Sequence, residues 1–110
     1  MVNINADKIL EALDQHCFIP NARRMEFHRE KAEKLIYNIR HFSVNVANMG
    51  DALLVLWSLP YYVLLYEDRC IKNGADPQEY RNIVVAMNNA VEEKIKAIVA
   101  TLALADKGSP

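Results

Sequence analysis

The sequence GDALLVLWSLPYYVLLY, residues 50–66, decides the fold of this chain. Its only charged residue is Asp51, and it holds the single Trp and three of the five Tyr of the chain. The uncharged run from Ala52 to Tyr66 has 15 residues and would span roughly 22 Å as a helix. A membrane span needs about 20 apolar residues. Acidic residues follow it at once, and no basic anchors stand beside it. We therefore predict the central helix of a helical domain and no membrane span.

The composition fits one folded domain. The chain has 110 residues, of which 52% are hydrophobic and 25% charged, and its formal net charge is −1. A chain of this length has room for one core, so we treat residues 1–110 as a single helical domain with flexible ends at 1–5 and 106–110. A net charge near zero gives no general attraction for nucleic acid. The hydrophobic fraction is high for a soluble domain and suggests surface that is hidden only in an assembly.

The two cysteines predict no special chemistry. Cys17 and Cys70 are far apart in the sequence and form no C-x-x-C pair. Charged residues interrupt the first 20 positions, so we expect no signal peptide. Free thiols in a reducing cytoplasm follow from this interpretation, and whether the two cysteines ever pair stays open.

The segment before the central stretch predicts two helices. A short helix should run from Ala6 to about Cys17, and Pro20 should follow its end because residues before a proline avoid the helical region. A second helix, with Asn21 as its cap, should reach about Met49. Its apolar positions follow a heptad repeat. They are Met25, His28, Ala32, Leu35, Ile39, Phe42, Val46 and Met49.

Gly50 and Asp51 suggest the end of one helix and the cap of the next. The heptad spacing continues past Gly50, however, and one longer helix is the alternative. The central helix should end near Asn73-Gly74. Pro60 lies inside it and predicts a kink, since proline removes one hydrogen bond and crowds the preceding turn.

The fourth helix has the strongest local signal of the chain. Asp76 is a capping residue, Pro77 occupies the first helical position, and Glu79 follows three residues after the cap. The helix should run from Pro77 to about Ala105. We therefore predict an all-α fold in which a short N-terminal helix precedes three longer antiparallel helices of an up-down bundle.

No catalytic or metal-binding motif is evident, so we expect a protein that is not an enzyme and needs no cofactor. None of the three histidines belongs to a Glu-x-x-His pattern. The second helix offers an acidic E-x-x-E pattern, but the central helix offers only Glu67 and Asp68, which are adjacent and point about 100° apart. Cys17 follows His16, and adjacent helical residues do not face each other.

Two arginines are candidate binding residues. Arg23 and Arg24 follow the predicted cap Asn21, so they would lie in the first turn of a helix, where acidic residues are favoured. Free amide groups and two guanidinium groups could together bind a phosphate or a partner's carboxylates. The alternative is that both arginines pair with nearby acids on a solvated surface.

A second group of candidates is aromatic. Steps of four residues place Trp57 with Tyr61, and Tyr62 with Tyr66, and Arg69 follows the second pair. Aromatic side chains on a kinked helix could stack a planar ligand or anchor a partner protein. The alternative is ordinary packing in the core.

These observations predict a small, cytoplasmic, non-enzymatic interaction protein. Two segments are apolar on every helical face, Leu53 to Tyr66 and Ala97 to Ala105, which favours a homo-oligomer that binds or inhibits, and so regulates, another protein. The alternative is a binder of a phosphate-bearing or nucleotide-like molecule, held between helices or subunits by the arginines and tyrosines. A third interpretation is a helical protein on a membrane surface.

Overall fold

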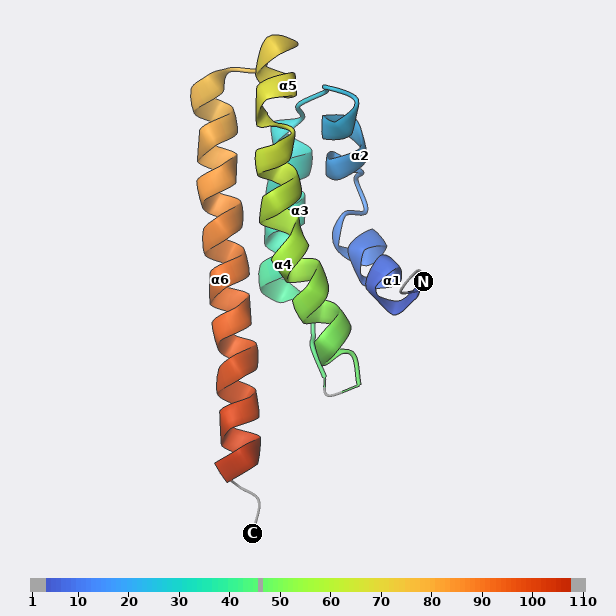
Figure 1. Cartoon of the computed structure of the whole chain (residues 1–110), viewed down its shortest axis with the longest axis vertical. Coiled ribbons are helices and arrows are strands. Elements are labelled where there is room, and N and C mark those ends of the chain that lie inside the picture. The colour runs from blue at the N-terminus through green and yellow to red at the C-terminus, as the bar shows by residue number, and fades with distance from the viewer. Residues whose placement is uncertain (1–3, 46, 108–110) are drawn as a thin grey trace.

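The computed structural model describes residues 4–45 and 47–107, and every regular element within these ranges is an α-helix (Figure 1). The predicted all-α class is confirmed. The helices are α1 (Ile4–Leu13), α2 (Phe18–Arg23), α3 (Arg29–His41), α4 (Met49–Leu65), α5 (Glu67–Lys72) and α6 (Pro77–Lys107). In Figure 1, α3 runs downward, α4 upward and α6 downward along the length of the molecule.

A buried carboxylate joins α1 to α2. α1 ends at Leu13, earlier than the predicted Cys17, which is exposed and has a positive φ of 61°. The side chain of Asp14 turns back and accepts hydrogen bonds from the backbone N–H groups of Phe18 (2.8 Å) and Ile19 (2.9 Å). These are amide groups at the start of α2, which a helix cannot satisfy by itself. Asp14 therefore satisfies the start of α2, whereas Asn21, which the sequence predicted to be the cap of the next helix, lies buried inside α2.

The long second helix predicted from Asn21 to Met49 is wrong, because α2 and α3 are separate. Met25 takes a left-handed φ of 69° and ends α2. Its N–H donates to the Ala22 carbonyl, and the N–H of Glu26 donates to the Asn21 carbonyl, each at 2.9 Å. This is the Schellman arrangement, which usually has glycine at the left-handed position. With methionine there instead, the sequence gives no sign of the turn.

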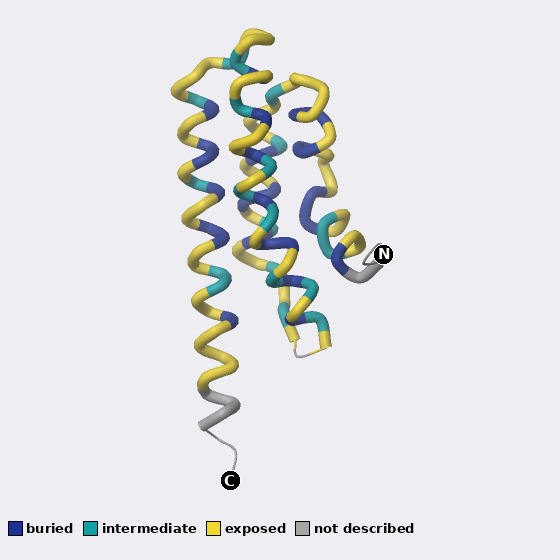
Figure 2. Tube along the Cα trace, viewed as in Figure 1, coloured by how far each residue is buried: buried dark blue, intermediate teal, exposed yellow. Residues whose placement is uncertain are grey.

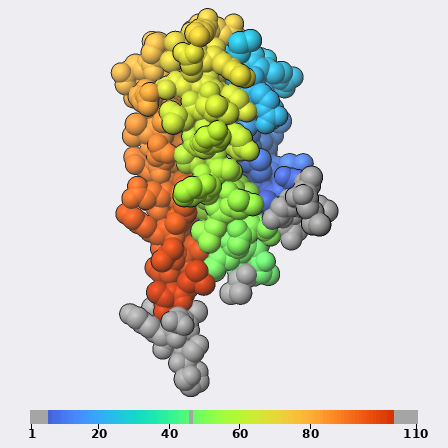
Figure 3. Space-filling model, in the orientation of Figure 1, coloured from blue at the N-terminus to red at the C-terminus, as the bar shows by residue number. Residues whose placement is uncertain are grey.

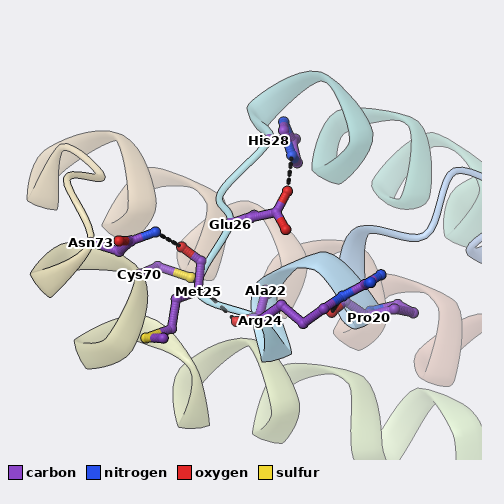
Figure 4. Close-up of polar contacts among 8 residues, drawn as sticks. All are labelled: Pro20, Ala22, Arg24, Met25, Glu26, His28, Cys70 and Asn73. Atoms are coloured by element: carbon purple, nitrogen blue, oxygen red, sulfur yellow. Dashed lines mark hydrogen bonds and ion pairs between the residues drawn. The ribbon is translucent and has the colours of Figure 1, made fainter.

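Side-chain contacts attach this turn to α5, as Figure 4 shows. Asn73 Nδ2 donates to the Met25 carbonyl at 2.7 Å, and Cys70 Sγ lies 3.6 Å from the Ala22 carbonyl oxygen. The break between α2 and α3 is thus supported by residues almost 50 positions away in the chain, which a local sequence pattern does not report.

The second boundary also differs from the prediction. α3 ends at His41, and α4 begins at Met49, so Gly50 lies in the first turn of α4 and is neither a helix stop nor followed by a cap. Asn45 and Asn48 exchange backbone-to-side-chain hydrogen bonds of 2.8 and 3.0 Å in the connection. The predicted heptad stripe holds only in part. Ala32, Leu35 and Ile39 are buried on α3, and Met49 is buried on α4; Phe42 is half-buried, Met25 and His28 are exposed, and Val46 lies outside the described residues.

The predicted central helix is present as α4 and α5. α4 continues through Pro60, and the interruption falls instead at Tyr66, between Leu65 and Glu67. Helical hydrogen bonds bridge it, from Tyr66 N–H to the Tyr62 carbonyl (3.1 Å) and from Cys70 N–H to the Tyr66 carbonyl (3.0 Å). The end near Asn73-Gly74 is confirmed, where Gly74 has a φ of 105°.

The fourth predicted helix is confirmed as α6. The Glu79 N–H donates to Asp76 Oδ2 at 2.8 Å, which is the predicted cap. α6 extends two residues past Ala105, to Lys107, and α1 includes Ile4 and Asn5, so these inner residues of the predicted flexible ends are helical. The remaining parts of those predicted ends, 1–3 and 108–110, lie outside the described residues.

The core lies where α6 packs against α3 and α4 and where α1 packs against α4 (Figure 2). Its largest fully buried side chains are Tyr80, Phe18, Leu35, Ile39, Leu56, Leu59, Met87, Val63 and Cys70. The Tyr80 hydroxyl donates to the Val63 carbonyl, which ties α6 to α4. Burial raises the pKa of the Tyr80 hydroxyl far above its ordinary value, so it stays a donor at any working pH.

The cap made by Asp14 predicts a pH-dependent stability. Burial raises the pKa of this carboxyl above 3.8, and the hydrogen bonds from Ile19 and Phe18 only partly oppose the rise. The folded protein therefore binds this proton more tightly than the unfolded chain. The contribution of Asp14 is largest below pH 3.8 and is lost as the pH rises through the raised pKa.

Urea unfolding measures the free energy of unfolding of wild type and Asp14→Asn at pH values from below 3.8 upward, and this checks the prediction. The stability of wild type relative to the variant should fall with rising pH and then level off. A relative stability that instead grows with pH would contradict it. Asp14→Ala should cost about 1 kcal/mol at low pH, because two amide groups lose their acceptor, and this cost should also fall with rising pH, since alanine does not titrate.

Candidate functional site

α4 has two apolar stripes on nearly opposite sides. Residues at alternating steps of three and four are buried on the inner stripe: Met49, Ala52, Leu56, Leu59, Val63, Tyr66 and, on α5, Cys70. A second run at the same steps is exposed: Gly50, Leu54, Trp57, Tyr61, Leu64 and, on α5, Asp68. At 100° per residue the two runs point about 150° apart. A surface helix normally has polar residues on the side away from the core.

We call Leu54, Trp57, Tyr61, Leu64 and Leu65 the outer stripe. Trp57 is 78% exposed and Tyr61 63%, and each of the three leucines is about half exposed. α4 lies on the face of the molecule shown in Figure 3, where its side chains form a continuous ridge beside α6. The outer stripe is thus a row of large apolar side chains that the described part of the chain leaves uncovered.

A groove lies beside the outer stripe, between α4 and α6. Its volume is about 520 Å³. The lining residues are Leu56, Trp57, Ser58, Pro60, Tyr61, Tyr62, Val91 and Ile95. The Ser58 hydroxyl donates to the Val55 carbonyl at 2.9 Å, so it already has a partner within the helix. The groove therefore offers mainly aromatic and aliphatic surface, with the two tyrosines as its polar lining.

The structure divides the predicted aromatic cluster. Trp57, Tyr61 and Tyr62 line the groove, whereas Tyr66 is buried. The rings of Tyr62 and Tyr66 stack with centroids 6.4 Å apart and planes 9° apart. The Tyr66 hydroxyl accepts a hydrogen bond from Arg23 Nε at 3.2 Å. Core packing thus accounts for Tyr66, while Trp57 and Tyr61 face outward.

The predicted helix-start pocket of Arg23 and Arg24 is wrong in its geometry. Arg23 is the last residue of α2 and Arg24 is its C-cap, so both lie at the carboxyl end of a helix. Cations are favourable at that end of a helix. The two arginines therefore do not oppose the helix dipole, as they would at a helix start. Arg24 Nε lies 3.5 Å from the Pro20 carbonyl oxygen of its own helix (Figure 4).

The candidate arginines do not join the aromatic groove. Arg69 is exposed on α5, and none of Arg23, Arg24 and Arg69 is among the groove-lining residues that the structure describes. Arg23 reaches the aromatic cluster only through Tyr66, away from the groove. The sequence missed the leucines of the outer stripe and the contribution of α6, because every position of residues 52–57 is apolar and fits any register.

A second groove, of about 570 Å³, lies between α3 and α6. It is lined in part by Arg29, Glu33, Arg40 and Glu79. Arg29 pairs with Glu79 at 2.8 Å and with Glu33 at 3.3 Å, and Arg40 pairs with Glu93 at 3.3 Å. Both guanidinium groups thus have carboxylate partners, and this groove offers a ligand less uncompensated charge than its lining residues suggest.

The structure also bears on a metal site and on a membrane span. Within the part of the chain that the structure describes, no three His, Cys, Asp or Glu side chains gather in a way that could hold a metal ion. The segment Met49–Lys72 is long and apolar enough to cross a membrane, and 39% of its most apolar window is buried. Length and composition alone give this result, and core helices of soluble proteins give it too.

Comparison with known proteins adds no relative. No protein-family model, no curated protein and no solved structure matches this chain.

The position of the arginines decides what their replacement should do. At a helix start, replacing Arg23 and Arg24 with Glu would suit the helix dipole and stabilise the fold. At the carboxyl end the double replacement should lower the melting temperature, because it puts negative charge beside free carbonyl groups and removes the bond to Tyr66. Thermal unfolding checks this, with the neutral double Gln variant as the control. A melting temperature of the Glu variant above that of the Gln variant would contradict the assignment.

Proposed function

We propose that this chain is a small, non-enzymatic interaction protein of the cytoplasm, which forms a homo-oligomer through the outer stripe of α4 and binds a partner protein. The observation that supports this most is the second apolar run on α4, opposite the core. Large contiguous apolar patches on a monomer mark interaction sites, and Trp and Tyr are the residues that most often dominate binding energy.

The exposed area supports the same proposal. The chain exposes 7155 Å², whereas a compact monomer of 12.6 kDa exposes about 6,200 Å². Part of this excess is the exposed end of α6, and part is the outer stripe, whose large side chains are about half exposed or more (Figure 2). Covering apolar area stabilises an assembly by ~25 cal/mol per Å², which amounts to several kcal/mol before the cost of association.

The partner-binding part of the proposal draws on a different end of the molecule. Arg23 and Arg24 are exposed at the end of α2, and Met25, 47% exposed, follows in a backbone conformation held by Asn73. Two guanidinium groups beside an exposed methionine suit acidic groups of a protein partner. Regulation or inhibition of that partner would follow from its capture at this end.

The second candidate function is small-ligand binding. The groove between α4 and α6 has a volume in the range of ligand pockets, roughly 300–1,000 Å³, and aromatic walls. A phosphate-bearing or nucleotide-like molecule would have to reach the arginines from outside this groove. A thermal-shift panel of nucleotides separates the two candidates, since only a binder is stabilised in proportion to the logarithm of ligand concentration.

We also propose that α3, α4 and α6 work as an up-down bundle with a kink in α4 at Pro60, which lines the groove. Pro60→Ala restores a backbone donor and raises helix propensity, so propensity alone predicts a gain in stability. If the core is built around a bend, the melting temperature should fall instead. A clear rise, with the oligomeric state unchanged, would remove the kink from the proposal.

The outer stripe predicts a specific effect on self-association. Leu54→Glu should weaken it by roughly a hundredfold, since each copy would place a charge in the apolar interface. Val85→Glu is a matched control, because Val85 is also 51% exposed on a helix but lies on α6, outside the outer stripe. Sedimentation equilibrium at micromolar concentrations measures both, with circular dichroism to confirm folding. A monomeric wild type, or equal association of the two variants, would contradict the proposal.

A further inference from the structure

We infer that the outer stripe is covered by a second copy of this chain whose α4 runs antiparallel, with Trp57 of each copy packed against Tyr61 of the other at the mouth of its groove. The inference rests on the proposed self-association and adds its direction and register. Three features of α4 point to this arrangement.

The first feature is the order of side chains along the outer stripe. Leu54, Trp57, Tyr61 and Leu64 have the same sequence of sizes in both directions, with the centre near position 59. In an antiparallel pair with that centre, Leu54 faces Leu64 of the second copy and Trp57 faces Tyr61. Each of these contacts joins side chains of similar size and polarity, and Leu65, the fifth residue of the outer stripe, would face the half-buried Leu53. A two-fold axis repeats each contact, as the isologous interface of a dimer requires.

The second feature is the chemistry at the two ends of the exposed run. Gly50, at one end, has nothing within 4 Å of the place where a Cβ would stand, and it lies in the first turn of α4. Asp68, at the other end, is exposed, and its ion pair within the described residues is with Lys72 of its own helix, at 3.0 Å. The antiparallel register brings Asp68 of one copy to Gly50 of the other. A carboxylate is favourable beside the first turn of a helix, and this attraction has to exceed the repulsion from Asp51, which lies in the same turn.

A parallel pair of α4 helices lacks these complementary contacts. It would set Asp68 against Asp68 of the second copy, which places two like charges at the same level, and Gly50 against Gly50, which leaves space unfilled. Trp57 would meet Trp57, the largest side chain against itself, while the leucines meet at both sides of it. Like charges placed together disfavour an arrangement by direct repulsion.

The third feature is the position of the groove. Its α4 residues run from Leu56 to Tyr62, so it is centred at position 59, the centre of the antiparallel register. Trp57 of the second copy would arrive beside Tyr61, which forms one wall. Aromatic anchors that enter a pocket near the middle of an interface are typical of binding hot spots. The groove and the most exposed side chain of the outer stripe thus complement each other across the two-fold axis.

Disulfide trapping tests the register directly. In a Cys17→Ser background, which removes the exposed thiol, Leu54→Cys and Leu64→Cys are made singly and together; Cys70 is buried and stays. Positions 54 and 64 are about 15 Å apart along one helix, whereas a disulfide needs Cα atoms roughly 4.4–6.8 Å apart. A mixture of the two single variants should form the mixed disulfide dimer under mild oxidation. Neither single variant should crosslink efficiently alone.

The outcomes separate the inference from the proposed function. Efficient crosslinking of Leu54→Cys with itself would show a parallel pair and overturn the inference while self-association stands. Dimers by sedimentation with no crosslink in the mixture, or no more than a Val85→Cys control gives, would place the interface elsewhere and overturn it as well. A protein that is monomeric by sedimentation would overturn both.

Discussion

The structure depends on one constraint: α4 is apolar on two opposite sides, and a chain of 110 residues has enough partner helices to cover only one of them. α6 and α1 pack on the inner stripe, where Leu56, Leu59 and Val63 are fully or almost fully buried. Among residues 4–45 and 47–107, no element covers Leu54, Trp57 and Tyr61, which stay half or more exposed. A helix that is hydrophobic on all sides is normally buried on all sides, and in the proposed dimer a second copy would complete that burial without a larger domain.

The connections between helices determine which side of α4 is covered. Asp14 starts α2 through two backbone hydrogen bonds, and Met25 ends it in a left-handed turn. This turn is unfavourable for a residue with a side chain. Contacts from Cys70 and Asn73, almost 50 positions later in the chain, compensate for it. Those contacts place α2 beside α5, where Arg23 meets Tyr66. The turn at Met25, which completes the core at this end, therefore also places two arginines on the surface.

The all-α class, the cap at Asp76 and the course of the last helix were predictable, because composition, period and capping chemistry are local properties of the chain. The break between α2 and α3 was not, since a Schellman turn on Met25 lacks the glycine that usually marks it. A buried carboxylate at Asp14 likewise resembles any surface acid in the sequence. In the candidate site, Trp57 and Tyr61 were found from their spacing. Their exposure could not be predicted, because an all-apolar run such as residues 52–57 fits every register equally well.

Trp57 also provides the most direct test of the central claim, because it is the only tryptophan of the chain and 78% exposed on the outer stripe. Its fluorescence can be followed while the protein is diluted from high to low micromolar concentration and below. If two copies cover the outer stripe, the emission maximum lies at short wavelength in concentrated protein and moves to longer wavelength on dilution, with the midpoint that sedimentation gives for dissociation. Emission that stays at the wavelength of a water-exposed tryptophan at every concentration would contradict the account.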